Sequence, residues 1–293
     1  MRVFVTGGTG LVGSAVVAEL LANGHTVLAL ARSNSSAAAV SAAGAEPIRG
    51  DLTDLDTIRA AAARSEGVIH LAFSNDFSSE DTVLAAVAEE GAAMAALGEE
   101  LTDSDRPYVT VSGTPMAAGR AATESDPLTS AGPVAGRVQS VTSVLDLATQ
   151  GVRSSAIRLP RTVYNNGTGG FTGILTTAAR QSGVAGYPGD GTQRWPAVHA
   201  LDAAVLFRLA LEKAPAGTAW HAVGDEGVAV RDMASVIGRR LGVPVESVPP
   251  EAFGPLAEIF ALDQPASSVH TREALGWEPE QPGLLADLEN IQP

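Results

Sequence analysis

Short apolar runs alternate with longer, alanine-rich stretches through the first half of the chain. The apolar runs predict β-strands near Val3–Thr6, Thr26–Leu30, Pro47–Arg49, Gly67–Leu71, Tyr108–Ser112 and Arg153–Leu159. The stretches between them predict helices near Leu11–Asn23, Asp54–Ala63, Asp81–Leu101 and Val138–Gln150. Strands that alternate with helices are typical of βαβ units. The pattern therefore predicts an α/β fold built on a doubly wound parallel sheet.

The regular pattern weakens after Pro160, where clusters of Asn and Gly predict loops around a short helix. A helix over Leu201–Lys213 and a strand over Ala219–Val223 are expected to return to the sheet, followed by a helix over Arg231–Leu241 and a strand over Val243–Val248. We therefore expect two regions that fold onto each other. One spans residues 1–163, with 197–225 returning to its sheet, and the other is a smaller substrate-binding region over 164–293.

Composition supports a folded protein and excludes several kinds of chemistry. The chain has 293 residues, of which 45% are hydrophobic and 18% charged, so it can bury a substantial core. It contains no cysteine, which excludes disulfides, thiolate catalysis and cysteine-ligated metal centres. No metal-ligand spacing is found, so we expect no metal site.

The acidic charge balance bears on partners and location. Nineteen Lys and Arg against 33 Asp and Glu give a net charge of −14. Such a surface repels phosphate backbones and anionic lipids, so we expect neither nucleic acid nor membrane as a partner. The start of the chain leaves no room for a signal peptide, and no apolar run reaches the ~18 residues of a membrane span. We expect a cytoplasmic protein.

A glycine-rich loop lies between the first predicted strand and the first predicted helix. It satisfies Gly8-x-Gly10-x-x-Gly13, which allows a tight turn and the close approach of a pyrophosphate to the helix N-terminus. The alternative is a turn without a ligand. The residues expected to contact a dinucleotide here are Gly7, Thr9, Gly10, Leu11, Val12 and Gly13.

The end of the second predicted strand bears on the choice of nucleotide. NAD sites usually carry a carboxylate there for the ribose 2′-hydroxyl, whereas this chain has Ala31 followed by Arg32 and Ser33. A guanidinium beside hydroxyls suits a 2′-phosphate, so we expect NADP(H). The alternative for Arg32 is a solvated loop residue.

Two further strand ends are expected to line the same nucleotide. Asp51 and Leu52 would meet the adenine, although Asp51 would serve equally as a turn cap. The small and apolar residues Leu71, Ala72 and Phe73 would let the cofactor lie against the sheet. The preceding His70 is either a structural histidine or a ligand contact.

At this point the chain resembles the short-chain dehydrogenase/reductase superfamily, in particular its extended or atypical members related to epimerases, dehydratases and 3β-hydroxysteroid dehydrogenases. The resemblance covers almost the whole chain. Beyond the glycine loop, it rests on Gly50-Asp51-Leu52, His70-Leu71-Ala72, Val109–Thr114, Arg158-Leu159-Pro160, Val198-His199-x-x-Asp202 and Leu275–Pro279. It implies a Rossmann fold with a smaller substrate domain, a cofactor that also contacts Ser112 and Pro160, and hydride transfer assisted by a Ser or Thr, a Tyr and a Lys.

The chain retains only part of that catalytic set. The hydroxyl position of the family falls on Thr114, with Ser112 as the neighbouring alternative. The Tyr-x-x-x-Lys motif is absent, because counting back from Arg158 places Pro133 and Arg137 at its two positions. Proline has no proton to give, and arginine is always charged, so Arg137 could orient a ribose or stabilise an oxyanion only.

The sequence offers one substitute acid and a set of pocket residues. Tyr164 aligns with a position that commonly lines the pocket, and the alternative is an aromatic side chain packed under the loop. Asn165, Arg194 and Trp195 are the further candidates for substrate contact; an interdomain salt bridge with packing would explain the last two equally well. His199 and Asp202 are expected to be structural.

These residues favour an NADP(H)-dependent oxidoreductase that reduces a small carbonyl substrate. The absent Tyr and Lys leave open a catalytically silent nucleotide sensor or scaffold, or an epimerase or dehydratase with bound cofactor. The low charge of the helix over 138–150 and the alanine-rich helix over 81–101 would suit a homodimer formed through this pair, although burial within a monomer would give the same pattern.

Overall fold

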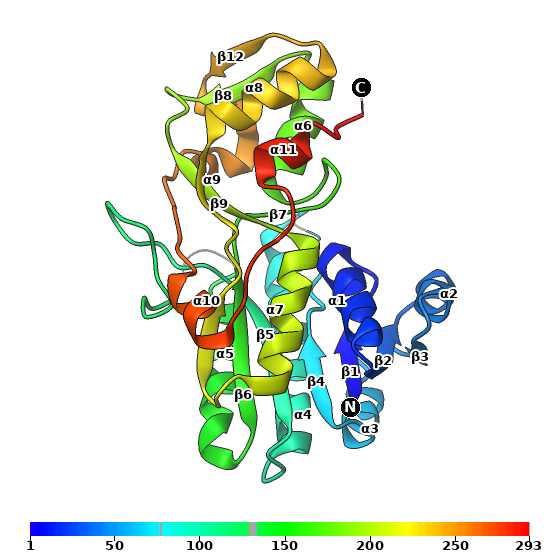
Figure 1. Cartoon of the computed structure of the whole chain (residues 1–293). Coiled ribbons are helices and arrows are strands. Elements are labelled where there is room, and N and C mark those ends of the chain that lie inside the picture. Colours follow the sequence, from blue (N-terminus) through cyan, green and yellow to red (C-terminus); the bar gives the residue numbers. More distant parts are fainter. Residues whose placement is uncertain (75, 77, 129–133, 293) are drawn as a thin grey trace.

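The computed structural model describes the chain except residues 75, 77, 129–133 and 293. The molecule has two parts (Figure 1). The larger part holds a seven-stranded sheet and the helices that flank it. The smaller part, drawn above it, contains most of the chain after residue 160.

The larger sheet has the strand order β10-β6-β5-β4-β1-β2-β3, and each neighbouring pair is parallel. Its strands are β1 (Arg2–Thr6), β2 (Thr26–Ala31), β3 (Glu46–Arg49), β4 (Gly67–His70), β5 (Pro107–Gly113), β6 (Arg153–Leu159) and β10 (Thr218–His221). The strand order reverses between β1 and β4. In such sheets ligands bind outside the carboxyl ends of the strands at this reversal.

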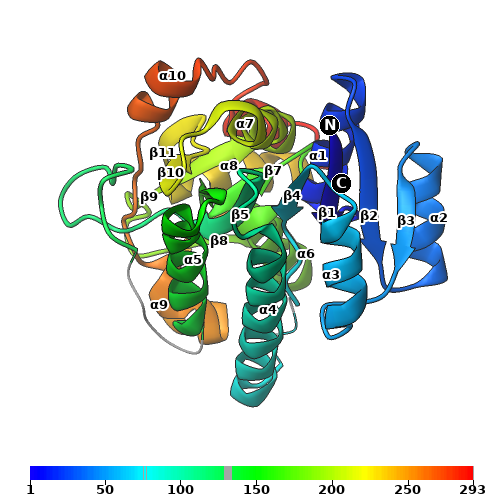
Figure 2. The same cartoon turned by 90° about the horizontal axis from the view of Figure 1, so that it is seen from below.

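Helices cover both faces of the sheet (Figure 2). One face packs against α1 (Leu11–Ala22), α2 (Asn34–Ala42) and α7 (Ala200–Lys213), and the other against α3 (Leu55–Ala63), α4 (Glu80–Leu101) and α5 (Gly136–Asp146). Alternate strand residues explain the two cores, because Val5 points toward the first set of helices and Phe4 toward the second. The predicted doubly wound α/β fold is confirmed.

The smaller part contains two short sheets. In the first, β9 (Arg194–His199) lies between β7 (Thr162–Tyr164), which is parallel to it, and β11 (Asp225–Ala229), which is antiparallel. In the second, β8 (Ala185–Pro188) pairs with β12 (Val245–Val248). The helices of this part are α6 (Gly170–Ser182), α8 (Val230–Leu241), α9 (Ala257–Phe260) and α11 (Leu284–Leu288), whereas α10 (Val269–Leu275) lies beside the larger part (Figure 1).

The structure corrects three expectations about local structure. No helix is predicted between the second and third strands, whereas α2 lies there, with Ser33 as its N-cap in a capping box with Ser36. The segment between Pro160 and Leu201 contains strands β7, β8 and β9 where loops are predicted around one helix. The last predicted strand begins at Val245, since the Val243 N–H closes the end of α8 by bonding Gly238.

Candidate active site

The glycine loop joins the end of β1 to the start of α1. Gly7 has a φ of +75°, in the left-handed region that favours glycine, and a Cβ on Gly13 would lie 2.0 Å from the Gly7 carbonyl oxygen. Helix α1 begins without a side-chain cap and with no acidic residue in its first turn. Its N-terminal N–H groups therefore face an opening that suits an anion.

The outer side of this loop has room for a dinucleotide backbone. A Cβ on Gly10 would meet only the Gly7 oxygen, at 3.6 Å, among the residues that the structure describes. Thr9 and Leu11 are exposed beside it, and Val12 is half-buried. The loop is thus tight where α1 meets β1 and open where a pyrophosphate would lie, so the residues present fit a dinucleotide.

A free cation lies at the end of β2. Arg32 is exposed and forms no hydrogen bond or ion pair with any described residue, whereas the preceding Ala31 is buried. Ser33 accepts from the Ser36 N–H at 3.1 Å and its own N–H donates to the Ser36 hydroxyl at 2.9 Å. The Ser33 hydroxyl therefore serves α2 first, and the Arg32 guanidinium is available to a ligand.

Asp51, after the end of β3, was predicted either to contact the adenine or to cap its turn, and its hydrogen bonds decide between these roles only in part. Its Oδ1 accepts from the Thr53 hydroxyl at 2.6 Å and from the Thr53 N–H at 2.9 Å, and these bonds hold the pKa of Asp51 below its ordinary value. Asp51 caps its own turn, while its Oδ2 bonds no described residue. Leu52, half-buried beside it, packs against the core below α3.

Thr6 ties the end of β1 to the segment after β4. Its hydroxyl accepts from the N–H groups of Leu71 at 3.2 Å and Ala72 at 3.3 Å, and lies 2.9 Å from His70 Nδ1. Leu71, Ala72 and Phe73 are half-buried at the point where the strand order reverses. Of the two roles open to His70, this geometry favours the structural one.

Complete burial, with a smaller effect of the Arg137 charge, lowers the pKa of His70 to about 3. The imidazole is therefore neutral at physiological pH. Nδ1 of His70 shares a hydrogen bond with the Thr6 hydroxyl, whereas Nε2 bonds no described residue.

A cavity of about 240 Å³ lies where the end of β5 meets the start of α5. Its polar side chains are Ser112, Thr114 and Arg137, and the rest of its lining is apolar or small: Val111, Gly113, Pro115, Leu128, Val134, Ala135, Val138 and Val141. The Ser112 Oγ is buried and unpartnered among the described residues. The structure thus brings these three predicted site residues together, while their roles stay predictions.

Thr114 is held by its backbone. Its N–H donates to the Leu159 carbonyl at 3.0 Å, just before the buried Pro160, and its carbonyl accepts from Gln264 Nε2 at 3.2 Å. Gln264 also accepts from Arg161 Nε, and Arg161 places its guanidinium over the Phe171 ring. Burial lowers the pKa of Arg161 to about 10, so it remains charged.

Arg137 forms an ion pair with a buried acid on the neighbouring helix. Its Nε and Nη2 donate to the two oxygens of Glu90 at 2.7 and 2.8 Å. The Glu90 side chain is 2% exposed and that of Arg137 is 27% exposed. The guanidinium lies 4.1 Å from the centre of the Phe73 ring. Two contacts thus fix the orientation of the one charged group in the cavity.

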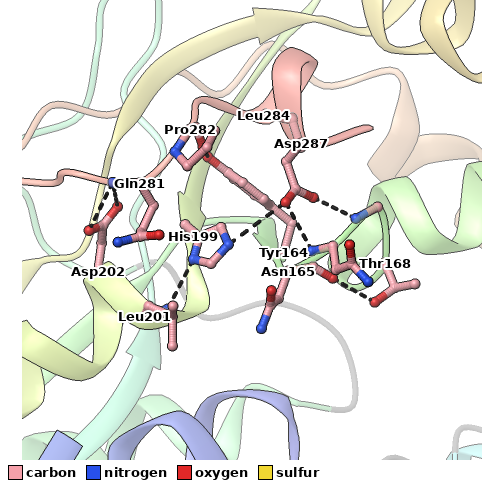
Figure 3. A network of polar contacts seen from close by, with 12 residues as sticks. Tyr164, Asn165, Thr168, His199, Leu201, Asp202, Gln281, Pro282, Leu284 and Asp287 are labelled. Atoms are coloured by element: carbon pink, nitrogen blue, oxygen red, sulfur yellow. Dashed lines mark hydrogen bonds and ion pairs between the residues drawn. The ribbon is translucent and has the colours of Figure 1, made fainter. Parts of the chain in front are cut away.

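Tyr164 is not placed to give a proton to a substrate in this cavity. Its hydroxyl donates to the Pro282 carbonyl at 2.9 Å and reaches Asp225 at 3.3 Å, and its ring packs edge-on against His199 (Figure 3). Burial, reinforced by Asp225, raises the pKa of Tyr164 well above its ordinary value. The expectation that Tyr164 replaces the missing acid is therefore corrected in favour of its alternative, a packed aromatic residue.

The loop after Tyr164 is held by an acid of α11. Asp287 accepts from the N–H groups of Asn166 at 2.9 Å and Gly167 at 2.7 Å, while Asn165 pairs with Thr168 through its backbone (Figure 3). Asn165 is half-buried, and it is not among the described residues that line the cavity at Thr114. Its predicted substrate contact is not supported by this geometry.

Arg194 and Trp195 also take the structural alternative. Arg194 forms a two-point ion pair with Asp263, at 3.1 and 2.8 Å, in a separate depression of the smaller part. Trp195 is fully buried, donates to the Leu262 carbonyl at 3.2 Å and packs against Phe171. Neither lines the cavity at Thr114, so their expected roles in substrate binding are corrected.

Sequence reasoning missed Glu90 and Gln264, the residues that fix Arg137 and Thr114. It also placed Pro133 at the position of the family tyrosine, and this residue lies outside the described part of the chain. Across the described residues no group of acidic residues and histidines is arranged to hold a metal ion, and none of their helices has the length and hydropathy to cross a membrane.

Comparison with known proteins identifies relatives along the whole chain. The profile of the NAD dependent epimerase/dehydratase family matches residues 3–222. The "Uncharacterized protein C2A9.02" of Schizosaccharomyces pombe is 42% identical over 294 residues and covers 98% of both chains. A 4-hydroxy-2-methyl-3-oxo-4-farnesyl-3,4-dihydroquinoline-1-oxide ketoreductase of Stigmatella aurantiaca is 27% identical over 255 residues, which are 84% of this chain and 75% of the ketoreductase.

Solved structures show the same fold. The dTDP-glucose 4,6-dehydratase DesIV of Streptomyces venezuelae, solved with NAD bound, superposes with a TM-score of 0.79 at 21% identity. The match covers 99% of this chain and 95% of the dehydratase. The likeness includes the smaller part and therefore extends beyond the nucleotide-binding sheet.

Proposed function

The chain belongs to the NAD dependent epimerase/dehydratase family, and on that premise we propose that it is an NADP(H)-dependent reductase of a small carbonyl substrate. The observation that carries the proposal is the cavity beside the reversal of the strand order, where Ser112, Thr114 and Arg137 converge. When bound, the nicotinamide supplies a hydride to the substrate carbon. The remaining tasks belong to the side chains of the chain.

The nucleotide would be held along the ends of three strands. The glycine loop and α1 would bind the pyrophosphate, Asp51 Oδ2 would accept from the adenine amine, and Leu71 to Phe73 would support the nicotinamide side. The free Arg32 at the N-terminus of α2 favours a 2′-phosphate, because two cationic contributions meet there without a competing acid.

In the cavity, the substrate oxygen would lie between the hydroxyls of Thr114 and Ser112, which donate hydrogen bonds to it as negative charge develops. Arg137, held by Glu90, adds a permanent charge beside them. Arg137 would contact the nicotinamide ribose or the oxyanion, and it would not transfer a proton.

The geometry argues against a nucleotide-sugar substrate. Arg194, the first residue of β9, would be the natural partner of a substrate phosphate, but Asp263 already accepts two hydrogen bonds from its guanidinium. Asp190 lines the same depression, which adds negative charge where a diphosphate would lie. This favours the reductase over an epimerase or dehydratase of nucleotide sugars.

A silent nucleotide sensor is the second candidate, and one observation favours it. Because the Tyr164 hydroxyl is hydrogen-bonded to Pro282 and Asp225, no described side chain takes over the proton transfer of the family tyrosine. A sensor would bind NADPH and turn over no substrate.

The test begins with titration of the cofactor-free protein with NADPH and NADH, followed by NADPH oxidation with ketones, aldehydes and enones. We expect NADPH to bind more tightly than NADH and one class of carbonyl compound to be reduced.

Arg32→Ala should weaken NADPH binding by about tenfold or more and leave NADH binding unchanged, because it removes a charged hydrogen bond to the 2′-phosphate. Arg64→Ala, at the exposed end of α3, is the control. Binding without turnover would favour the sensor, and binding of neither nucleotide would refute both.

We also propose a homodimer through the outer faces of α4 and α5. A groove of about 610 Å³ runs between these helices. Gly91, Gly98 and Gly136 line it and place no side chain in it. Light scattering of the purified protein tests this, with a dimer that dissociates in Ala95→Arg as the expected result. A monomeric wild type would refute it.

A further inference from the structure

Among the residues that the structure describes, the cavity at Thr114 has donors for an oxygen atom but no acid. Its described polar side chains are two neutral hydroxyls and a guanidinium. The segment 129–133 reads Thr-Ser-Ala-Gly-Pro and contributes no Tyr, His, Lys, Asp or Glu. A substrate here is therefore surrounded by groups that stabilise negative charge and by none that neutralises it at pH 7.

The side chains of Tyr164, Glu90 and His70 are ionisable, but each is already bonded to another residue. The Tyr164 hydroxyl bonds Pro282 and Asp225, and the two Glu90 oxygens both accept from Arg137. His70 is fully buried and is bonded through Nδ1 to Thr6. Each of these groups would have to break its own contacts before it could transfer a proton to a substrate.

Arg137 is suited to hold an oxyanion for the lifetime of an intermediate. Glu90 fixes Nε and Nη2, so the guanidinium cannot rotate freely, while Nη1 bonds no described residue. An arginine remains charged throughout the accessible pH range and donates hydrogen bonds without losing its proton. Together with the unpartnered Ser112 Oγ it forms a preorganised donor pair.

On the basis of the function proposed above, we propose that the substrate is a conjugated enone and that the enzyme reduces its carbon–carbon double bond. Bound NADPH would supply the hydride that forms a C–H bond at the β-carbon, and the π electron pair of the substrate would move onto the carbonyl oxygen. The resulting enolate oxygen is held by Arg137, Ser112 and Thr114. Water then delivers one proton to the α-carbon, which gives the saturated ketone and NADP⁺.

The difference in basicity between the two oxyanions supports this choice. Hydride addition to an isolated ketone leaves an alkoxide, which is about as basic as hydroxide. An enol resembles a phenol, whose pKa is about 10. A site without an acid can stabilise the weaker base until it leaves, whereas reduction of an isolated ketone needs a proton donor in the transition state.

The binding test uses 4-nitrophenol, a stable oxyanion whose ionised form is yellow. It is titrated against pH in the presence of the protein and NADP⁺. We expect the pKa of the bound phenol to fall by about one unit or more, which is tenfold selection of the anion. Arg137→Gln should abolish this shift and Arg137→Lys should retain part of it. A bound phenol with an unchanged or raised pKa, or no binding at all, would overturn the proposal.

The kinetic test compares 2-cyclohexen-1-one with cyclohexanone, which have the same ring. We expect kcat/KM with NADPH to favour the enone by about 100-fold or more. Replacing H₂O by D₂O should leave the rate of the hydride step unchanged. The Tyr164→Phe variant should reduce the enone at the wild-type rate. Equal rates for the two ketones, or a large D₂O effect, would overturn this inference while the reductase stands. Failure to reduce either ketone or any carbonyl compound would also refute the proposed function.

Discussion

The ion pair between Glu90 and Arg137 should be worth different amounts to its two partners. Glu90 is 2% exposed, so Arg137→Met leaves a carboxylate that water cannot reach, and loss of one partner of a buried pair costs about 3–5 kcal/mol. Arg137 is 27% exposed, so in Glu90→Leu the guanidinium keeps part of its hydration. We expect that variant to lose about 1.5–3 kcal/mol, the range for a hydrogen bond to a charged group.

The double variant Glu90→Leu/Arg137→Met removes both charges and should be nearly as stable as the wild type, because apolar residues can replace a buried pair at little cost. The assay is urea denaturation of the four proteins, compared as a double-mutant cycle. With a slope of about 3 kcal/mol per M, a loss of 3 kcal/mol in Arg137→Met lowers the midpoint by about 1 M. The expected coupling between the two sites is several kcal/mol.

The exposed pair of Arg59 with Glu99, also between helices, is the matched control. Their side chains are 39% and 67% exposed, and Arg59→Met should cost less than about 1 kcal/mol. The reasoning would be refuted if Arg137→Met proved less destabilising than Glu90→Leu, or if the two single effects added in the double variant. Arg137 could then not be regarded as fixed by a partner isolated from solvent.

Four further variants test other parts of the site. Gly13→Ala should unfold at clearly lower urea concentration, because its Cβ would lie 2.0 Å from a carbonyl oxygen. Gly10→Ala should fold normally and bind NADPH at least about tenfold more weakly. A nucleotide titration in which Gly10→Ala binds NADPH nearly as tightly as the wild type would contradict this. Because burial lowers the pKa of His70 to about 3 from an ordinary 6.5, the unfolded chain binds the proton more tightly, so stability should fall as pH drops from 6.5 toward 3, by up to about 1.4 kcal/mol per pH unit. His70→Gln should flatten this slope in urea titrations, and an unchanged slope would assign it to other groups. Gln264→Leu removes the N–H that holds the Thr114 carbonyl, so kcat should fall about tenfold with an unchanged KM for NADPH; equal changes in both would indicate general disruption.

Local sequence signals predicted the part of the site that local structure builds. The glycine loop, the helix predicted from Asp54 and the place of Arg137 follow from residues close together in the chain or from the regular spacing of βαβ units. Helix α2 was not predicted because hydroxyl residues favour both loops and helix N-caps, and only the reciprocal hydrogen bonds of Ser33 and Ser36 distinguish the two.

The remaining contacts depend on segments that are distant in sequence. Glu90 is one of several acids on α4, and its burial is decided by α5, which begins some fifty residues later. Tyr164 and Arg194 read as pocket residues because their partners, Pro282 and Asp263, lie near the C-terminus. No periodicity or motif links those positions.

The place of α7 and β10 constrains how the protein is made. These elements, from residues 200–221, cover the apolar side of α1 and add the outermost strand beside β6, although the other six strands end by residue 159. A nascent chain of 163 residues therefore exposes Leu20 and its neighbours, which are fully buried in the finished protein. At about 5–20 residues per second, the ribosome needs roughly 3–12 s to synthesise the missing segment. During that interval the nucleotide-binding half is a client for chaperones, and a gene split at this point would yield a fragment prone to aggregation.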